Sequence, residues 1–250
     1  NARDRLTPLL ESCSQTAVQA IFLETADTNE AKMLSRFCRH FAPILTQALM
    51  EKGVYQPQNS QLPRLHLFWH DAQTVQIGYT LPTHSSPWPM GIPRLKFPAH
   101  APSRSTLKLA EAFSSLLTER EQHHCLQAGM HAVDLGACPG GWTYQLVQRG
   151  IYTLGVDNGR LHPSLLATGL AKHLAADGFR YRPPKAVDWL VCDMVEQPHR
   201  IVELIAHWFI QGWCRYSVFN LKLPMKQRWQ HLQQCLQQLD SQLGRAGIKY

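Results

Sequence analysis

The most informative segment of the chain is Val133-Asp134-Leu135-Gly136-Ala137-Cys138-Pro139-Gly140-Gly141-Trp142. Its apolar start predicts a buried strand, and its glycines and proline predict a tight turn before a helix. Backbone without side chains can approach a ligand closely at such a turn. The dinucleotide-binding fingerprint would require glycine at position 138, where this chain has Cys138. The segment therefore favours a nucleoside ligand without a pyrophosphate, with an ordinary strand-to-helix turn as the alternative.

Short apolar runs and amphipathic runs alternate around this segment. We expect strands at 132–136, 152–157, 189–193 and 217–221, and helices at about 103–113, 142–148, 198–211 and 227–244. Such alternation is typical of an α/β domain with a doubly wound, mainly parallel sheet. Ligands of these domains bind at the carboxyl ends of the strands. The glycine-rich turn follows the first expected strand and therefore lies at the ligand edge.

Two carboxylates follow the glycine-rich turn. Asp157 ends the second expected strand, about 20 residues later, where a carboxylate can accept hydrogen bonds from ribose hydroxyls. Asp177 lies in the next loop and could accept a hydrogen bond from an adenine amino group. Both also occur in sequences typical of plain polar turns, Asp157-Asn158-Gly159 and Asp177-Gly178. The spacing of Asp157 supports the nucleoside interpretation.

Three charged residues are candidates for the reaction. Asp193 and Lys222 end the third and fourth expected strands, which would place both at the ligand edge, and Lys108 lies in the preceding helix. A poorly solvated lysine beside a second cation can lose its proton and act as a general base, held in position by a carboxylate. Taken alone, Asp193 and Lys222 are equally compatible with a salt bridge between two strands.

The chain divides into three segments. Residues 1–81 resemble a small α+β domain, with a helix near Glu30 to Glu51 and strands at 65–69 and 74–81 joined by a hairpin turn at 71–73. Six prolines at positions 82–102 predict a stiff, extended, basic linker. Residues 103–250 form the α/β domain.

The composition favours a soluble protein with a polyanionic partner. The chain has 25 Lys and Arg against 18 Asp and Glu, and residues 72–110 and 204–239 contain no acid. Seven cysteines form no CxxC pair, and no His/Cys cluster has metal-ligand spacing, so neither disulfides nor a metal are expected. No run approaches the roughly 18 apolar residues of a membrane span, and the first residues do not form a signal peptide. We expect a cytoplasmic protein without a membrane partner.

The motifs DLGACPGGW (134–142), VDNG (156–159), DGF (177–179), VCDM (191–194) and FNLKLPMK (219–226) follow MGIPRLKFPAHAPSRSTLK (90–108). In this order they closely resemble the ribosomal RNA large subunit methyltransferase M family, over essentially the whole chain. The resemblance implies a Rossmann-like S-adenosylmethionine methyltransferase domain preceded by part of a THUMP-like RNA-binding domain. It implies methylation of a cytidine 2′-hydroxyl in 23S ribosomal RNA, free or in a large-subunit precursor. It does not indicate the oligomeric state.

The resemblance also implies roles for individual residues. The cofactor pocket would be lined by Cys138, Pro139, Gly140 and Gly141, and S-adenosylmethionine would contact Ser105, Asp157, Asp177 and Asp193. Lys222 would be the proton acceptor, and Lys108, Asp193 and Lys222 would be the first three members of the Lys-Asp-Lys-Glu tetrad of ribose methyltransferases. The fourth member of that tetrad lies, in the family, beyond the point where this sequence stops at Tyr250. We therefore expect that this chain lacks segments that the family's proteins have at both ends.

Other functions fit the sequence less well. Methylation of a base amino group generally uses an Asn/Asp-Pro-Pro-aromatic motif, where this chain has Asp193-Met194-Val195-Glu196, and carbon-5 methylation of cytosine needs a cysteine that usually follows proline. A non-catalytic RNA-binding protein would not require three reactive residues around one crevice, and a dehydrogenase would need the dinucleotide fingerprint. Among the tryptophans we expect only Trp88 to contact RNA, and most of the others to lie in the core.

Overall fold

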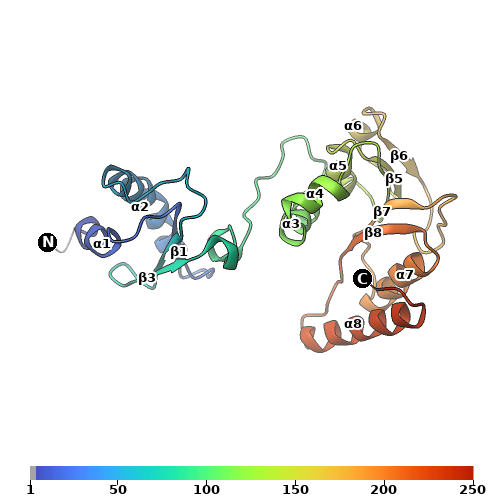
Figure 1. Ribbon diagram of the computed structural model, residues 1–250. Coiled ribbons are helices and arrows are strands. Elements are labelled where there is room, and N and C mark those ends of the chain that lie inside the picture. The colour runs from blue at the N-terminus through green and yellow to red at the C-terminus, as the bar shows by residue number, and fades with distance from the viewer. Residues whose placement is uncertain (1–3, 250) are drawn as a thin grey trace. The chain divides into compact units, whose positions relative to one another are not determined.

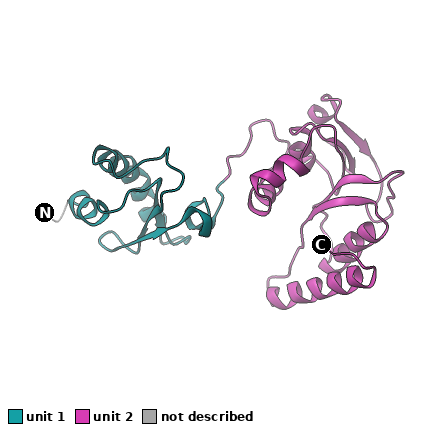
Figure 2. Ribbon diagram, viewed as in Figure 1, with its two compact units in different colours: residues 1–94 teal, residues 95–250 magenta. Residues whose placement is uncertain are grey.

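The computed structural model describes residues 4–249, so residues 1–3 and Tyr250 lie outside the described part. The chain forms two compact units, residues 1–94 and 95–250 (Figure 2). Each unit has its own hydrophobic core, as is usual for separate domains. Within the described residues, no helix is both long enough and apolar enough to cross a bilayer.

Unit 1 is a three-stranded sheet packed against helices. Its elements are α1 (Leu6–Cys13), β1 (Ala20–Thr25), α2 (Lys32–Glu51), β2 (Arg64–Trp69), β3 (Val75–Thr80), and the short 3-10 helices η1 (Pro82–His84) and η2 (Pro89–Gly91) (Figure 1). β2 lies in the centre, parallel to β1 and antiparallel to β3. Alternate residues of β2, Leu65, Leu67 and Trp69, pack in the core with Leu45 and Leu49 of α2, as the period of two in a strand requires.

The helix and the hairpin expected in unit 1 are confirmed as α2, β2 and β3. Asp71 closes the hairpin by accepting hydrogen bonds from the backbone N–H groups of Gln73 and Thr74. β1 was not expected, because Ile21-Phe22-Leu23 is a continuous apolar run that hides the alternation. Only Ile21 and Leu23 of this run pack against the core.

The proline-rich segment is divided between the two units. Residues 82–94 belong to unit 1, where Met90 donates its backbone N–H to Glu24 Oε1 at 2.5 Å and Arg64 donates to Ser85 Oγ at 2.7 Å. Pro82 and Pro89 each begin a short 3-10 helix, which is a position where the missing N–H of proline does no harm. This half of the segment is therefore folded onto the sheet of unit 1 and is not an extended connector.

Unit 2 contains a five-stranded sheet. Its elements are α3 (Thr106–Leu116), α4 (Glu119–Cys125), β4 (His131–Leu135), α5 (Gly141–Val147), β5 (Tyr152–Val156), α6 (Pro163–Leu166), β6 (Ala171–Leu174), β7 (Val187–Cys192), α7 (Pro198–Ile210), β8 (Cys214–Phe219) and α8 (Arg228–Arg245) (Figure 1). The strand order is β6-β5-β4-β7-β8, and all neighbours are parallel. The expected α/β fold with a doubly wound parallel sheet is confirmed.

Helices cover both faces of this sheet. Val133 and Leu135 of β4 and Leu190 of β7 face α7, where Ile205 and Trp208 are fully buried. The alternate residues Ala132, Trp189 and Val191 face α3 and α5. α8 packs in turn on α7 through Leu239 and Leu243. The central strands are therefore buried on both sides, which explains their nearly continuous apolar sequences.

The fourth expected strand is shifted. β8 pairs with β7 from Val187↔Cys214 to Cys192↔Phe219, so the expected strand at 217–221 was wrong by two residues at its end. Its register is set by β7, which also stops after Cys192. Asn220 and Lys222 consequently lie in the loop that follows the strand. The short elements β6, α4 and α6 were not expected.

Candidate active site

A pocket of about 340 Å³ lies at the carboxyl edge of the unit 2 sheet. Its lining includes one residue after each of four strands: Gly136 after β4, Asp157 after β5, Asp177 in the loop after β6 and Asp193 after β7. The strand order reverses between β4 and β7, and crevices at such reversal points are the usual ligand sites of open α/β sheets. The pocket is also within the size range of small-molecule sites.

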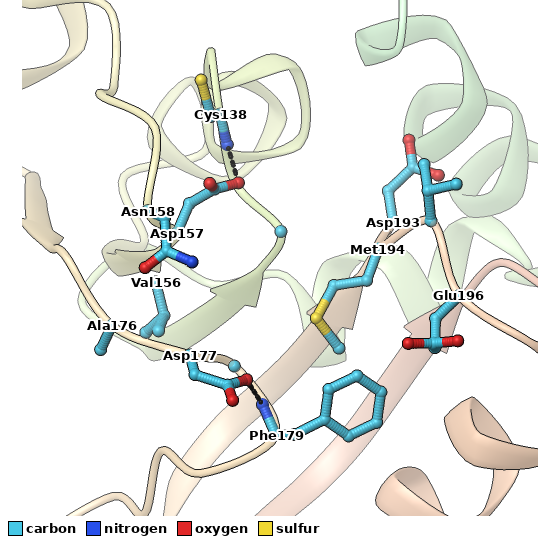
Figure 3. Close-up of a pocket in the computed structure, with 13 residues that line it drawn as sticks. Cys138, Val156, Asp157, Asn158, Ala176, Asp177, Phe179, Asp193, Met194 and Glu196 are labelled. Carbon is cyan, nitrogen blue, oxygen red and sulfur yellow. Dashed lines mark hydrogen bonds between the residues drawn. The ribbon is translucent and has the colours of Figure 1, made fainter.

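The pocket holds two carboxylates oriented by backbone N–H groups. Asp157 Oδ2 accepts from Cys138 N at 2.9 Å, and Asp157 Oδ1 accepts from Gly159 N at 2.7 Å. Asp177 Oδ1 accepts from Phe179 N at 2.9 Å (Figure 3). Each carboxylate oxygen has more than one lone pair, so both groups can also accept a hydrogen bond from a ligand.

An apolar wall adjoins these carboxylates. In Figure 3, Met194 lies between Asp157 and Asp177 on one side and Asp193 and Glu196 on the other, and the ring of Phe179 lies beside it. Glu196 is paired with Arg200, with Nη1 and Oε2 2.5 Å apart. The pocket thus offers carboxylate acceptors next to apolar surface, which suits a nucleoside with ribose hydroxyls and a flat ring.

The glycines of the turn are required by close packing. A Cβ on Gly140, whose φ is +118°, would lie 2.2 Å from Leu165 Cδ1. A Cβ on Gly141 would lie 2.0 Å from Ser105 Oγ and 2.9 Å from the backbone nitrogen of Thr106. The turn therefore fits tightly against α6 and the start of α3.

The residues assigned to the cofactor fall into two groups, according to whether they line the pocket. Cys138, Asp157, Asp177 and Asp193 line the pocket, whereas Ser105, Pro139, Gly140 and Gly141, which also belong to the described residues, are not part of its lining. The second group shapes the turn that positions Cys138 and Asp157. Direct contact of that group with a cofactor stays a prediction.

The three reactive candidates form one cluster. Lys108 Nζ of α3 lies 2.9 Å from Asp193 Oδ2, and Lys222 Nζ contacts Asp193 Oδ1. Asn220 Nδ2 donates to the same Oδ1 at 2.8 Å. The structure therefore brings together Lys108, Asp193 and Lys222 as expected. Asn220 was missed because it was assigned to the interior of a strand.

The partners of Asp193 determine its charge. Burial alone would raise the pKa of Asp193, but hydrogen bonds from Lys222, Asn220 and Lys108 outweigh this effect and hold the pKa below its usual value. Asp193 is therefore ionised at neutral pH. One carboxylate cannot neutralise two ammonium groups, so the cluster has an excess of positive charge at the edge of the pocket.

A second buried carboxyl lies beneath the pocket, in β4. Thr143 Oγ1 donates to Asp134 Oδ2 at 2.7 Å, while Asp134 Oδ1 has no hydrogen-bond partner within the described part of the chain. Burial raises the pKa of Asp134 to about 7, and the negative charges of Asp193 and Asp157 contribute to the rise. Sequence reasoning attached no role to this residue because it lies inside a strand.

Comparisons with known proteins support this description. Residues 4–81 match the family model described as ribosomal RNA large subunit methyltransferase M, N-terminal, and residues 101–212 match the FtsJ-like methyltransferase model. Proteins named ribosomal RNA large subunit methyltransferase M are 52% identical in Alkalilimnicola ehrlichii, 47% in Histophilus somni and 52% in Methylococcus capsulatus. These matches cover 93%, 100% and 99% of this chain and 65%, 72% and 69% of those proteins.

The chain thus spans about two thirds of the length of these relatives. The two family models match one unit each. Identity near 50% extends over almost the entire chain. The chain belongs to the ribosomal RNA large subunit methyltransferase M family.

Proposed function

We propose that this chain carries the catalytic centre of an S-adenosylmethionine-dependent methyltransferase, which methylates a cytidine 2′-hydroxyl of 23S ribosomal RNA with Lys222 as the general base. The main support is the contact of Lys108 and Lys222 with Asp193 at the edge of the pocket. Family membership supports methyl transfer to ribosomal RNA. Three details of the substrate rest on the motif resemblance: the ribose 2′-hydroxyl, the cytidine and the 23S molecule.

The pocket residues fit the proposed cofactor. When bound, S-adenosylmethionine supplies a methyl group carried by a positively charged sulfonium. Asp157 would accept hydrogen bonds from its ribose hydroxyls and Asp177 from its adenine amino group, while Phe179 and Met194 provide apolar surface for the adenine ring. The carboxylates of Asp157 and Asp177 also complement the cofactor's positive charge.

The lysine cluster supplies the proton chemistry. A ribose hydroxyl is neutral and must lose its proton while its oxygen forms the new bond to the methyl carbon and the bond from that carbon to sulfur breaks. Lys222 Nζ would accept this proton. Lys108 Nζ contacts the same carboxylate and would help to hold Asp193 in place beside Lys222. General-base help of this kind contributes on the order of 10² to 10⁴ in rate.

The wider setting is also part of the proposal. Unit 1 would be part of a THUMP-like domain that binds the RNA, and the protein would act in the cytoplasm on free 23S RNA or on a large-subunit precursor. The formal charge of +7 supports a polyanionic substrate.

The test uses the full-length protein, unmodified large-subunit RNA and methyl-labelled cofactor. We expect Lys222→Ala and Lys222→Arg to lower the single-turnover rate by about 10² to 10⁴, because arginine keeps the positive charge but does not lose its proton. Cofactor affinity, measured by calorimetry, should change little in either variant. Lys172→Ala, which removes an exposed lysine of β6, is the control.

The position of the label decides between the alternatives. Label on a ribose that disappears in the Lys222 variants is the expected result. Label on a base, or full activity of Lys222→Arg, would contradict the mechanism. RNA binding without any methyl transfer by the unaltered protein would favour a non-catalytic RNA-binding protein.

A further inference from the structure

The end of the loop after β8 and the first two residues of α8 carry an exposed aromatic side chain among cations. We call this segment, residues 222–229, the basic–aromatic loop. It contains Lys222, Lys226 and Arg228, and it ends at Trp229, which is 70% exposed. Met225 in the same loop is also largely exposed. The other tryptophans are buried or half-buried. Trp88 is among the half-buried ones, and its contact with RNA stays a prediction.

This exposure is unusual for a tryptophan. The indole ring has a large apolar area, which is normally buried or used at an interface. The cations beside Trp229 lie in residues 204–239, where the sequence has no acidic residue. Arg228 Nη2 instead lies 3.0 Å from the sulfur of Met225, which is a weak acceptor. The loop therefore exposes both positively charged side chains and an aromatic ring to solvent.

The loop begins at the proposed base. Lys222 contacts Asp193 at the edge of the pocket, and Trp229 follows Lys222 by seven positions. Even a fully extended chain of this length spans only roughly 25 Å. An RNA strand that has its target ribose at Lys222 and runs along this loop therefore reaches Trp229 within a few nucleotides.

We propose that the basic–aromatic loop binds the single-stranded RNA that flanks the target nucleotide. Trp229 stacks on one unpaired base, and Lys226 and Arg228 bind neighbouring phosphates. This combination of an aromatic platform and cations is how proteins hold single strands without reading their sequence. The identity of the substrate rests on the proposed function. The location of the RNA-binding site rests on the exposure and charge of the loop.

The first experiment compares Trp229→Ala and Trp229→Phe in the full-length protein. The control is Leu116→Ala, which truncates an equally exposed apolar residue (72%) on α3, outside the loop. The probe is a fluorescently labelled single-stranded RNA that contains the target nucleotide, with affinity measured by anisotropy. Trp229→Ala should weaken binding about 5- to 150-fold. Trp229→Phe should keep most of the affinity, and KM for the cofactor should stay unchanged in all three variants.

Salt dependence separates the two kinds of contact. Each phosphate contact to a single strand contributes about 0.7 to the slope of log affinity against log salt concentration. The double variant Lys226→Ala/Arg228→Ala should therefore reduce the slope by about 1.4. Trp229→Ala should leave the slope unchanged, because stacking releases no counterions.

Three results would overturn the proposal. The first is an affinity of Trp229→Ala within twofold of Leu116→Ala, and the second is an equal loss in Trp229→Phe. The third is the absence of iodide quenching of Trp229 fluorescence in the full-length protein without RNA. Another segment or a second copy of the protein would then cover the ring. None of these measurements requires methyl transfer, so they are independent of the Lys222 test. Trp229 can stack on RNA as proposed while the methyl label is found on a base. That result would refute the proposed function, but the role of the loop in binding RNA would remain.

Discussion

Two carboxyl groups near the same sheet edge have opposite pKa shifts because burial dominates at Asp134, whereas hydrogen-bond donors outweigh burial at Asp193. Asp193 receives donors from two lysines and an asparagine, so its pKa falls. Asp134 is fully buried, has one hydroxyl donor and one oxygen without a partner, and its pKa rises to about 7. The first group is therefore a fixed negative charge, and the second is close to half-protonated at neutral pH. At neutral pH, Asp193 therefore carries a full negative charge and Asp134 only part of one.

Asp134 should make the stability of unit 2 depend on pH. Its folded-state pKa lies above the value of about 4 for an unfolded aspartate, so the native state binds the proton more tightly. Its contribution to stability is complete below pH 4 and is lost as the pH rises to about 7. Between these values, the free energy of unfolding should fall by a few kcal/mol more in the natural protein than in Asp134→Asn.

The measurement is urea unfolding at several pH values, with Glu111→Gln as a control that alters an exposed carboxyl of α3. Asp134→Asn should be less stable at low pH, because an amide also leaves a buried polar group without a partner. Parallel pH profiles for Asp134→Asn and the natural protein would show that folding does not raise the pKa of Asp134.

Sequence reasoning found the residues at the ligand edge that carry charge. Lys108, Asp193, Lys222, Asp157 and Asp177 follow or face strand ends, and strand ends can be recognised from apolar runs. Asn220 and Trp229 were missed for a different reason. Their importance depends on the register of β8 against β7 and on how much of each side chain remains exposed, and neither property is contained in the local sequence.

Among the elements, the long helices α7 and α8 were easier to predict than the short helices and strands. The 3.6-residue period of α7 and α8 is clear over many residues, and both helices begin and end within one residue of the expected bounds. β6 has only four residues, and β1 is a continuous apolar run, so neither shows a full alternation. Short strands are defined by their pairing partners, which explains why β1 and β6 were not expected.

α8 should depend on a single apolar stripe for its attachment to α7. Leu239 is 7% exposed and packs with Val202 and Ala206, whereas Leu236 on the same helix is 41% exposed. Leu239→Ala should lower the free energy of unfolding of unit 2 by about 2 to 4 kcal/mol. Leu236→Ala should lower it by less than about 1 kcal/mol.

Urea unfolding with and without S-adenosylhomocysteine measures this difference. The proposed cofactor site lies in unit 2, so this demethylated form of the cofactor should stabilise only the transition of that unit and thereby identify it. Equal effects of the two substitutions would mean that α8 does not depend on this stripe.

At the scale of the whole molecule, the two cores are separated by a long stretch without buried residues. Within the described chain, no side chain between His70 and Ser105 is buried. The prolines predicted a boundary in this stretch, but they could not show that residues 82–94 fold onto unit 1. That distinction depends on individual contacts, such as the hydrogen bond of Met90 to Glu24.

Limited proteolysis should reveal this organisation. Trypsin should cleave first after Arg94, Lys96 or Arg104, because these residues lie in irregular backbone between the two cores. Mass spectrometry of the earliest fragments identifies the sites, and S-adenosylhomocysteine should not protect Arg94 or Lys96. A first cut inside residues 106–245 would show that unit 2 opens more readily than the segment before it.

The cluster around Asp193 also has a consequence for the order in which the protein becomes competent during translation. Lys108 emerges from the ribosome early, whereas Lys222 emerges near the end of the described chain. At about 5 to 20 residues per second, on the order of 10 seconds pass between them. In the later part of this interval the nascent chain contains Asp157 and Asp177 but not the proposed base. A growing chain could therefore acquire the means to hold a nucleoside before it can remove a proton from its substrate.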